Sequence, residues 1–367
     1  MIVPAAEDIQ LIVRLMRRDH EAVARLSASR RAPIETVADF AAAHGLAPVL
    51  LAALDGSPLR GAFSSSRLEA LEERRAAQVA RSRRLVAALE HLAEDLGAAG
   101  QNFLLLKGLY LAERFYGGID GREFVDLDLL VPRADRKRAF DLLSRAGWAR
   151  RSRVVVNTAL TCFFVHGFDF IAGAAKLDLH WCLSRHPSVR VDEARVWLRR
   201  RSALVSGRAY DVLADEDEIV FGALSLLRDL ERGRPKIKNI VDLVQMAAVL
   251  DATAAWEEML ETGRAEGTYG PMVNVLGACL DIAAASDLAP RLAAALARHG
   301  ARRVPLRPGD SPLAPSPRLF HIGNKIWSAR AHDCSPATWL LWWASSLPFR
   351  VAVHRRVRKR APQPPAL

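Results

Sequence analysis

Apolar side chains recur at the three- and four-residue spacing of amphipathic helices through residues 1–100. This spacing predicts several short helices followed by one long helix. Ser66 stands three residues before Glu69, which is the spacing of a capping box at a helix N-terminus. The apolar stripe that follows ends near Gly97, and glycine is common just after a helix. The first part of the chain is therefore predicted to be an N-terminal helical region.

The pattern changes after residue 100. Phe103–Leu106 is an apolar run too short for a helix and typical of a buried strand, and Leu109–Tyr116 follows as a short helix. Apart from its acidic residues, Glu123–Val131 is apolar and is typical of a second, buried strand. Further along we expect a helix at Ala134–Ala146 and strands at Val154–Phe170 and Lys176–Trp181. These elements predict a nucleus of strands and helices over residues 101–210.

The remaining sequence returns to helical spacing. Residues 211–300 are predicted to form a C-terminal helical domain, and residues 301–367 a loop, a terminal apolar helix and a basic tail. The predicted fold class is therefore α+β, with a small mixed β-sheet core flanked by N-terminal and C-terminal helical regions.

The end of the chain combines an apolar, tryptophan-rich segment at 337–353 with basic residues at 354–360. An amphipathic helix lying on an anionic membrane has this composition, so peripheral membrane contact through 337–360 is one interpretation. The other is a final helix packed on the domain and followed by a disordered basic tail. We favour the packed helix.

The net charge is weaker evidence for nucleic-acid binding than its size suggests. The 367 residues carry a formal net charge of +11, but arginine and alanine are both abundant, a combination typical of GC-rich genomes. No basic motif with interleaved aromatic residues, of the kind that reads single strands, is evident. Nucleic acid is therefore an unlikely partner, and RNA binding ranks low among the function classes.

Cysteine usage and the N-terminus indicate the compartment. The chain has four cysteines, and they are far apart with no CxxC pair, which favours reduced thiols over disulfides or a zinc site. The first residues lack the basic and apolar regions of a signal peptide. No run approaches the ~18 apolar residues of a membrane-spanning helix. We expect a cytoplasmic protein.

The strongest candidate for chemistry is a pair of aspartates within the second predicted strand. Asp126 and Asp128 lie two residues apart and should therefore face the same side, while Val125, Leu127 and Leu129 face the core. Two neighbouring carboxylates repel each other, and burying either without a partner is unfavourable. A divalent cation removes this conflict. The pair therefore predicts a Mg²⁺ site, which is often associated with phosphate chemistry.

Several local sequences occur in a recognisable order. They are Leu106-Lys107-Gly108, Arg122 four residues before Asp126-x-Asp128-Leu-Leu-Val131, Ala146-Gly147-Trp148 at a helix end, and Leu177-Asp178-Leu-His180-Trp181. Over about residues 70–250 this order resembles an uncharacterised bacterial nucleotidyltransferase family of the DNA-polymerase-β-type nucleotidyltransferase superfamily.

The resemblance implies a transferase that uses Mg²⁺ and an NTP. Asp126 and Asp128 would bind the metal and the β- and γ-phosphates, and Asp178 would be the third carboxylate at a second metal. Such a centre moves a nucleoside monophosphate to a hydroxyl or phosphate acceptor by a two-metal mechanism. The acceptor, whether peptide, protein or small molecule, is not indicated. The alternative is a catalytically silent module that binds a nucleotide or a protein; a degenerate member would usually have lost one of the three carboxylates.

Nucleotide-binding residues are less clearly indicated. Lys107 and Gly108 occupy the place of the superfamily's Gly-Ser phosphate turn, and Lys107 could instead simply end a strand in solvent. Arg122 could bind phosphate bidentately or be a loop charge. Lys236 and Lys238 could reach the triphosphate or form a solvated pair.

Two further residues carry open alternatives. His180 is expected to be a hydrogen-bonded structural histidine rather than a ligand. Asp242 could orient a lysine or arginine near the site, or lie on a helix surface.

Overall fold

The structure is a computed structural model. It describes residues 6–30, 32–151, 166–184, 186, 188–231, 236–299 and 337.

The N-terminal region is helical, as its apolar spacing predicts. Its short helices are α1 (Ala6–Met16), α2 (His20–Ser29), α3 (Thr36–His44) and α4 (Ala47–Leu54), followed by the 3₁₀ turn η1 (Pro58–Ala62). Their buried faces meet around side chains such as Ile12, Phe40 and Leu50, each fully buried. This apolar contact, rather than intrinsic propensity, stabilises helices that are so short.

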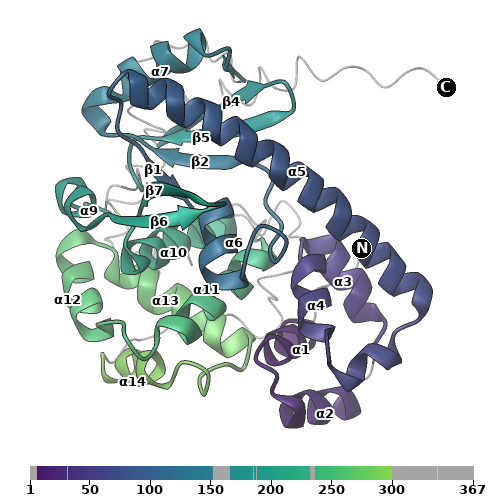
Figure 1. Ribbon diagram of the computed structural model, residues 1–367. Helices are drawn as coiled ribbons and strands as arrows, with labels where there is room; N and C mark the ends of the chain where they lie inside the picture. The colour runs from purple at the N-terminus through teal and green to yellow at the C-terminus, as the bar shows by residue number, and fades with distance from the viewer. Residues whose placement is uncertain are drawn as a thin grey trace.

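The long helix α5 (Ser65–Ala98) connects this bundle to the rest of the molecule. Figure 1 shows it running from the N-terminal helices across the sheet, over β2 and β5. It ends next to Gly97, as expected, but the capping-box prediction at Ser66 is wrong. The helix already begins at Ser65, and its N-cap Ser64 makes no side-chain capping bond.

The centre is a seven-stranded mixed sheet with the order β3-β4-β5-β2-β1-β7-β6. The strands are β1 (Leu104–Leu106), β2 (Leu127–Leu130), β3 (Ala149–Arg150), β4 (Gly167–Ala172), β5 (Ala175–His180), β6 (Arg201–Val205) and β7 (Arg208–Val212). β2 runs parallel to β5 and antiparallel to β1, and β1 runs parallel to β7. The α+β fold class with a mixed sheet and flanking helices is confirmed.

Side-chain alternation gives the sheet two different faces. Leu127 and Leu129 belong to the main core beneath α5 and α7 (Arg136–Arg145). Leu104, Leu106 and Leu130 point the other way and pack with Phe221 of α10 (Asp215–Glu231). Polar residues that alternate with the first set therefore face the α10 side of the sheet.

One orientation expected from alternation is wrong. Val125 is 37% exposed instead of facing the core. The reason is the length of the strand: β2 begins at Leu127, where its pairing with β5 begins, so the two-residue period does not extend back to Val125.

Between β1 and the C-terminal helices lie several connecting elements. They are α6 (Gly108–Tyr116), the 3₁₀ turn η2 (Arg133–Asp135), α7, and α9 (Glu193–Arg199). The hairpin of β6 and β7 has no counterpart among the sequence predictions. Its turn is Ser206-Gly207, both at positive φ, which is the conformation of a tight two-residue hairpin turn.

The C-terminal helices lie on the side of the sheet away from α5, and two of them contact α1 of the N-terminal bundle. They are α10, α11 (Ile237–Leu250), α12 (Trp256–Glu266), α13 (Tyr269–Ile282) and α14 (Pro290–Arg298). All five lie within residues 211–300, where the sequence predicts a helical domain. No helix of the described part is long and apolar enough to cross a membrane.

Some predictions fall outside the described residues. These are the strand expected over most of 154–165, the loop, apolar helix and basic tail of 301–367, and two of the four cysteines, Cys162 and Cys334. Cys182 and Cys279 are described, and both are buried thiols. The division of the chain into four regions stays a prediction.

Candidate active site

Two of the predicted carboxylates lie side by side on neighbouring strands. Asp128 of β2 is the direct register partner of Asp178 of the parallel strand β5. Because residues in register on paired strands point to the same face, both face the α10 side of the sheet. Together with His180 they place one ligand atom each within 4.8 Å of one another. This separation allows a single cation to contact both carboxylates.

The two carboxylates respond oppositely to their surroundings. Burial and the neighbouring charges of Asp128 and Asp169 raise the pKa of Asp178 to about 8. Burial would also raise the pKa of Asp128, but the hydrogen bond from His180 and the charge of Lys107 outweigh it and lower that pKa to about 2. The pair thus titrates as one anion and one carboxylic acid near neutral pH. A bound cation would let both ionise.

His180 orients Asp128. Its Nε2 lies 3.1 Å from Asp128 Oδ1, and because an ionised carboxylate only accepts, Nε2 donates the proton. Burial lowers the pKa of His180, which keeps the ring neutral. The ring also stacks on His166 with a centroid separation of 5.3 Å. This arrangement fits a hydrogen-bonded structural histidine.

A further carboxylate lies next to Asp178 on the neighbouring strand. Asp169 of β4 is the register partner of Asp178 and shares a hydrogen bond with it. Asp128, Asp178 and Asp169 therefore form a row across three adjacent strands. Asp169 is not among the site residues predicted from sequence. The signal available was its place in an alternating apolar run, Phe168-Asp169-Phe170.

Asp126 lies just before β2 and outside the group whose ligand atoms fall within 4.8 Å. It is nevertheless electrostatically part of the site. Burial and the charge of Asp128 raise its pKa, while Lys238, Lys236 and Lys107 act in the opposite direction. The aspartates before and on β2 and on β5 are therefore close to the lysine at the N-cap of α6 and to the two lysines at the start of α11.

The turn at Lys107-Gly108 connects β1 to α6. Lys107 has φ +41° and ψ −135°, a backbone conformation that side chains other than glycine rarely adopt. Its amide donates to Glu218 Oε1 at 3.1 Å, and its ammonium lies 3.9 Å from the centroid of Phe221. Lys107 is thus directed into the protein beside Asp128, and burial lowers its pKa. This differs from a lysine that ends a strand in solvent.

Arg122 is occupied by another partner. Its Nε and Nη2 donate to the two carboxylate oxygens of Asp242 at 2.7 and 2.6 Å. The side chains are 5% and 7% exposed, and Tyr116 also donates to Asp242 at 2.7 Å. Of the two roles considered for Asp242, orienting an arginine near the site agrees with this geometry. A phosphate contact from Arg122 would have to compete with this bidentate pair.

The lysines of α11 differ from each other. Lys236 is exposed at the N-cap. Lys238 donates from Nζ to the carbonyl oxygen of Glu123 at 3.1 Å. Burial and the charge of Arg122 lower its pKa to about 8. Lys238 is therefore a half-buried cation beside the site and not a solvated one.

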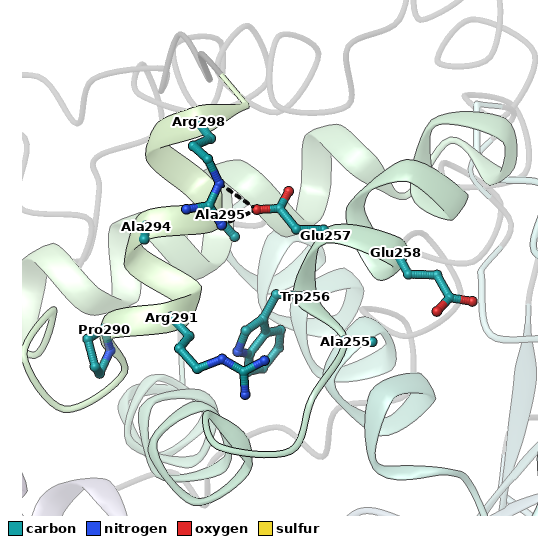
Figure 2. A pocket seen from close by; sticks show the side chains of 9 residues that line it. All are labelled: Ala255, Trp256, Glu257, Glu258, Pro290, Arg291, Ala294, Ala295 and Arg298. Atoms are coloured by element: carbon teal, nitrogen blue, oxygen red, sulfur yellow. Dashed lines mark hydrogen bonds and ion pairs between the residues drawn. The ribbon is translucent and has the colours of Figure 1, made fainter.

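A separate hollow of about 450 Å³ lies between the start of α12 and α14 (Figure 2). Three of its four charged lining side chains, Glu257, Arg291 and Arg298, already have partners. Arg298 pairs with Glu257, and Arg291 donates to the carbonyl of Asp251 at 2.7 Å. None of the predicted site residues lines it, so the carboxylate row stays the candidate centre.

Comparison with protein families places the chain. The model of a family described as uncharacterised nucleotidyltransferase matches residues 31–279, more than half of the sequence. The chain belongs to this family. The matched segment runs from α3 through the sheet with its carboxylates into α13, and it leaves out α1 and α2.

Other comparisons add little. No curated protein matches the chain significantly. A solution structure of the antibiotic-resistance factor ANT(2'')-Ia matches with a TM-score of 0.36 and 17% identity, over 50% of this chain and 91% of that one. A crystal structure of an antigenic nucleotidyltransferase-like protein from Paracoccidioides brasiliensis matches with a TM-score of 0.34 and 14% identity, over 59% and 92%. At these scores the likenesses carry no conclusion about activity, and the family assignment rests on the sequence match.

Proposed function

We propose that this protein is a Mg²⁺-dependent nucleotidyltransferase of the DNA-polymerase-β type, from a bacterial branch of that superfamily. It would move a nucleoside monophosphate from an NTP to a hydroxyl or phosphate of an acceptor. In that reaction an acceptor oxygen forms a bond to the α-phosphorus. The bond from the α-phosphorus to the bridging oxygen breaks, and pyrophosphate leaves with the electron pair.

One observation carries the proposal. Asp128 and Asp178 face the same side in direct register, with ligand atoms within 4.8 Å. The raised pKa of Asp178 means that this pair cannot hold two negative charges by itself. Hard oxygen ligands suit Mg²⁺, so the donor set fits the metal that the family resemblance implies.

Asp126, Asp128 and Asp178 would hold the metal in this proposal. Bound Mg²⁺ would lower the pKa of the acceptor hydroxyl and neutralise charge developing on the leaving pyrophosphate, as in two-metal sites. His180 keeps Asp128 in place through its 3.1 Å hydrogen bond. With a cation bound, Asp178 would be ionised and would accept the proton of the acceptor hydroxyl.

The triphosphate would lie along the cationic side of the site. Lys107 and Gly108 lie at the N-terminus of α6, where backbone amides favour anions. Lys236 and Lys238, at the start of α11, favour the ionised form of Asp126. Arg122 is assigned a positioning role, because its pair with Asp242 ties the segment before β2 to α11.

The test is an assay of pyrophosphate release and label transfer with Mg²⁺ and each labelled NTP, with water or candidate peptides, proteins and small molecules as acceptors. Asp126→Ala, Asp128→Asn and Asp178→Asn should each lower the rate at least ~100-fold, the scale of losing a charged or acid–base group at a reaction centre. The matched control is Asp211→Asn on β7, an aspartate of the same sheet that pairs with Arg200 on the surface. It should keep the wild-type rate.

Two results would contradict the proposal. If Asp126→Ala is as active as the wild type, the carboxylates are not the reaction centre. If the wild-type protein binds NTP with Mg²⁺ but releases no pyrophosphate with any acceptor, the catalytically silent module is the correct function.

A further inference from the structure

The backbone of Lys107 is held in a conformation that its own sequence does not favour. At φ +41° the Cβ of a lysine crowds the backbone, and glycine is the residue that usually occupies this region. Such a conformation persists only where surrounding contacts impose it. The contacts that could do so come from α10.

Helix α10 contacts Lys107 at both ends of the residue. Glu218 Oε1 accepts the Lys107 amide hydrogen at 3.1 Å. One helical turn later, the ring of Phe221 lies 3.9 Å from the Lys107 ammonium. Because Glu218 and Phe221 are three residues apart, they share one face of α10, and both contact Lys107.

The burial of Glu218 does not by itself stabilise the fold. It is 1% exposed, and within the described residues its Oε2 has no hydrogen-bond partner. Burying a carboxyl group with one oxygen unsatisfied is unfavourable compared with an apolar side chain of similar size. The residue's hydrogen bond to the turn is the contact that distinguishes it from a core leucine.

The turn matters because it sets the direction of the next helix. The carbonyl oxygen of Lys107 accepts from the Leu111 amide at 2.8 Å, so Lys107 is the N-cap residue of α6. The first amides of a helix have no partner within the helix and point away from its N-terminus. A change in the backbone of Lys107 would therefore redirect both those amides and the lysine ammonium.

We propose that Glu218 is a positioning residue for the triphosphate, acting through its hydrogen bond to the backbone of Lys107. This inference rests on the proposed function, because it assigns the turn as the phosphate-binding segment. Glu218 does not touch the phosphates; it fixes the turn that does.

Binding of inorganic tripolyphosphate to the full chain, measured by calorimetry with Mg²⁺, tests this role without needing an acceptor. Glu218→Ala removes the acceptor oxygen, and we expect about tenfold weaker binding, equivalent to ~1.4 kcal/mol. Glu218→Gln retains an acceptor oxygen at the same position and should bind within about threefold of the wild type. The matched control is Asp217→Asn on the same helix, whose buried carboxylate pairs with Arg199 and not with the turn. It should leave tripolyphosphate binding unchanged.

A second comparison isolates the backbone. Lys107→Gly removes the ammonium and places at this position a residue that adopts positive φ without strain. In the Lys107→Gly background, Glu218→Ala should therefore weaken tripolyphosphate binding by less than it does in the wild-type background. Such non-additivity is expected of residues that act through one contact. Amide hydrogen exchange at Lys107 should accelerate in Glu218→Ala and not in Glu218→Gln.

The outcomes are distinguishable. If the wild type binds tripolyphosphate and Glu218→Ala binds it equally well, the positioning role is wrong and the proposed function stands. Equal losses in Glu218→Ala and Glu218→Gln would also overturn it, because the charge rather than the hydrogen bond would then matter. If the wild type binds no tripolyphosphate, the proposed function itself fails.

Discussion

The buried pair of Arg122 and Asp242 allows the most quantitative prediction. Replacing Asp242 by alanine leaves the Arg122 guanidinium 5% exposed without its carboxylate partner. Its remaining described contacts are two carbonyl oxygens, of Gly108 and Glu123, both at 3.4 Å. Removing one partner of a buried ion pair costs about 3–5 kcal/mol, because the other charge stays desolvated. Tyr116 also loses its 2.7 Å acceptor, which adds ~1 kcal/mol.

The expected loss for Asp242→Ala is therefore about 4–6 kcal/mol in the free energy of unfolding. Urea unfolding followed by circular dichroism and tryptophan fluorescence measures it. The double variant Arg122→Met with Asp242→Leu should recover most of the loss, since no unpaired charge remains. The exposed pair of Arg200 and Asp211 is the control, and Asp211→Ala should cost less than ~1 kcal/mol.

A cost below ~1 kcal/mol for Asp242→Ala would refute this reasoning, since it would mean that Arg122 is solvated. A double variant as unstable as the single one would also refute it. In that case the loss would come from packing and not from an uncompensated charge.

Two further predictions concern backbone geometry and pH. Gly267→Ala should lower the free energy of unfolding by at least about 3 kcal/mol. A Cβ there would lie 1.6 Å from the carbonyl oxygen of Ser188, and φ is +69°. Gly173→Ala should lower it by only about 1 kcal/mol, because φ is +57° but nothing lies within 4 Å of the added Cβ. Thermal unfolding of the two variants compares these costs directly, and equal losses would show that φ alone decides. The folded-state pKa of Lys238 is about 8, below its ordinary 10.5. Between these pH values the unfolded chain holds the proton and the folded chain does not. Stability should therefore rise with pH across this window, by at most ~3 kcal/mol. Urea unfolding at pH 7.5 and pH 10.5 should show this rise in the wild type and a smaller one in Lys238→Met; identical rises would contradict the assignment.

Much of the fold follows from local pattern. The helical spacing of the first hundred residues predicts the N-terminal helices and α5, and the apolar run at Phe103–Leu106 predicts β1. The hairpin of β6 and β7 was not predicted, because its strands are short and their polar residues are exposed on the edge of the sheet. Val125 was assigned to the wrong side because strand pairing, and not alternation, decides where β2 begins.

The residues of the candidate site are also partly predictable from the sequence. Asp126, Asp128 and Asp178 are candidates from sequence, since aspartates within apolar strands need a reason to be there. Asp169 and Glu218 were not singled out, because each is an ordinary acid in its local sequence. Asp169 becomes notable only by its register with Asp178, and Glu218 only by its distance to Lys107.

The sequence by itself determined most of the helices, the strands β1 and β5, and the placement of Asp128 and Asp178 on strands. It did so because helical and strand periodicities are local properties of the chain. Only the tertiary structure decided which charges meet. Asp128 lies beside Asp178, 50 positions further along the chain, because β2 and β5 pair in parallel. Arg122 pairs with Asp242 because α11 packs beside α6. Partners so far apart in sequence leave no local pattern, since the contact is created by strand pairing and helix packing.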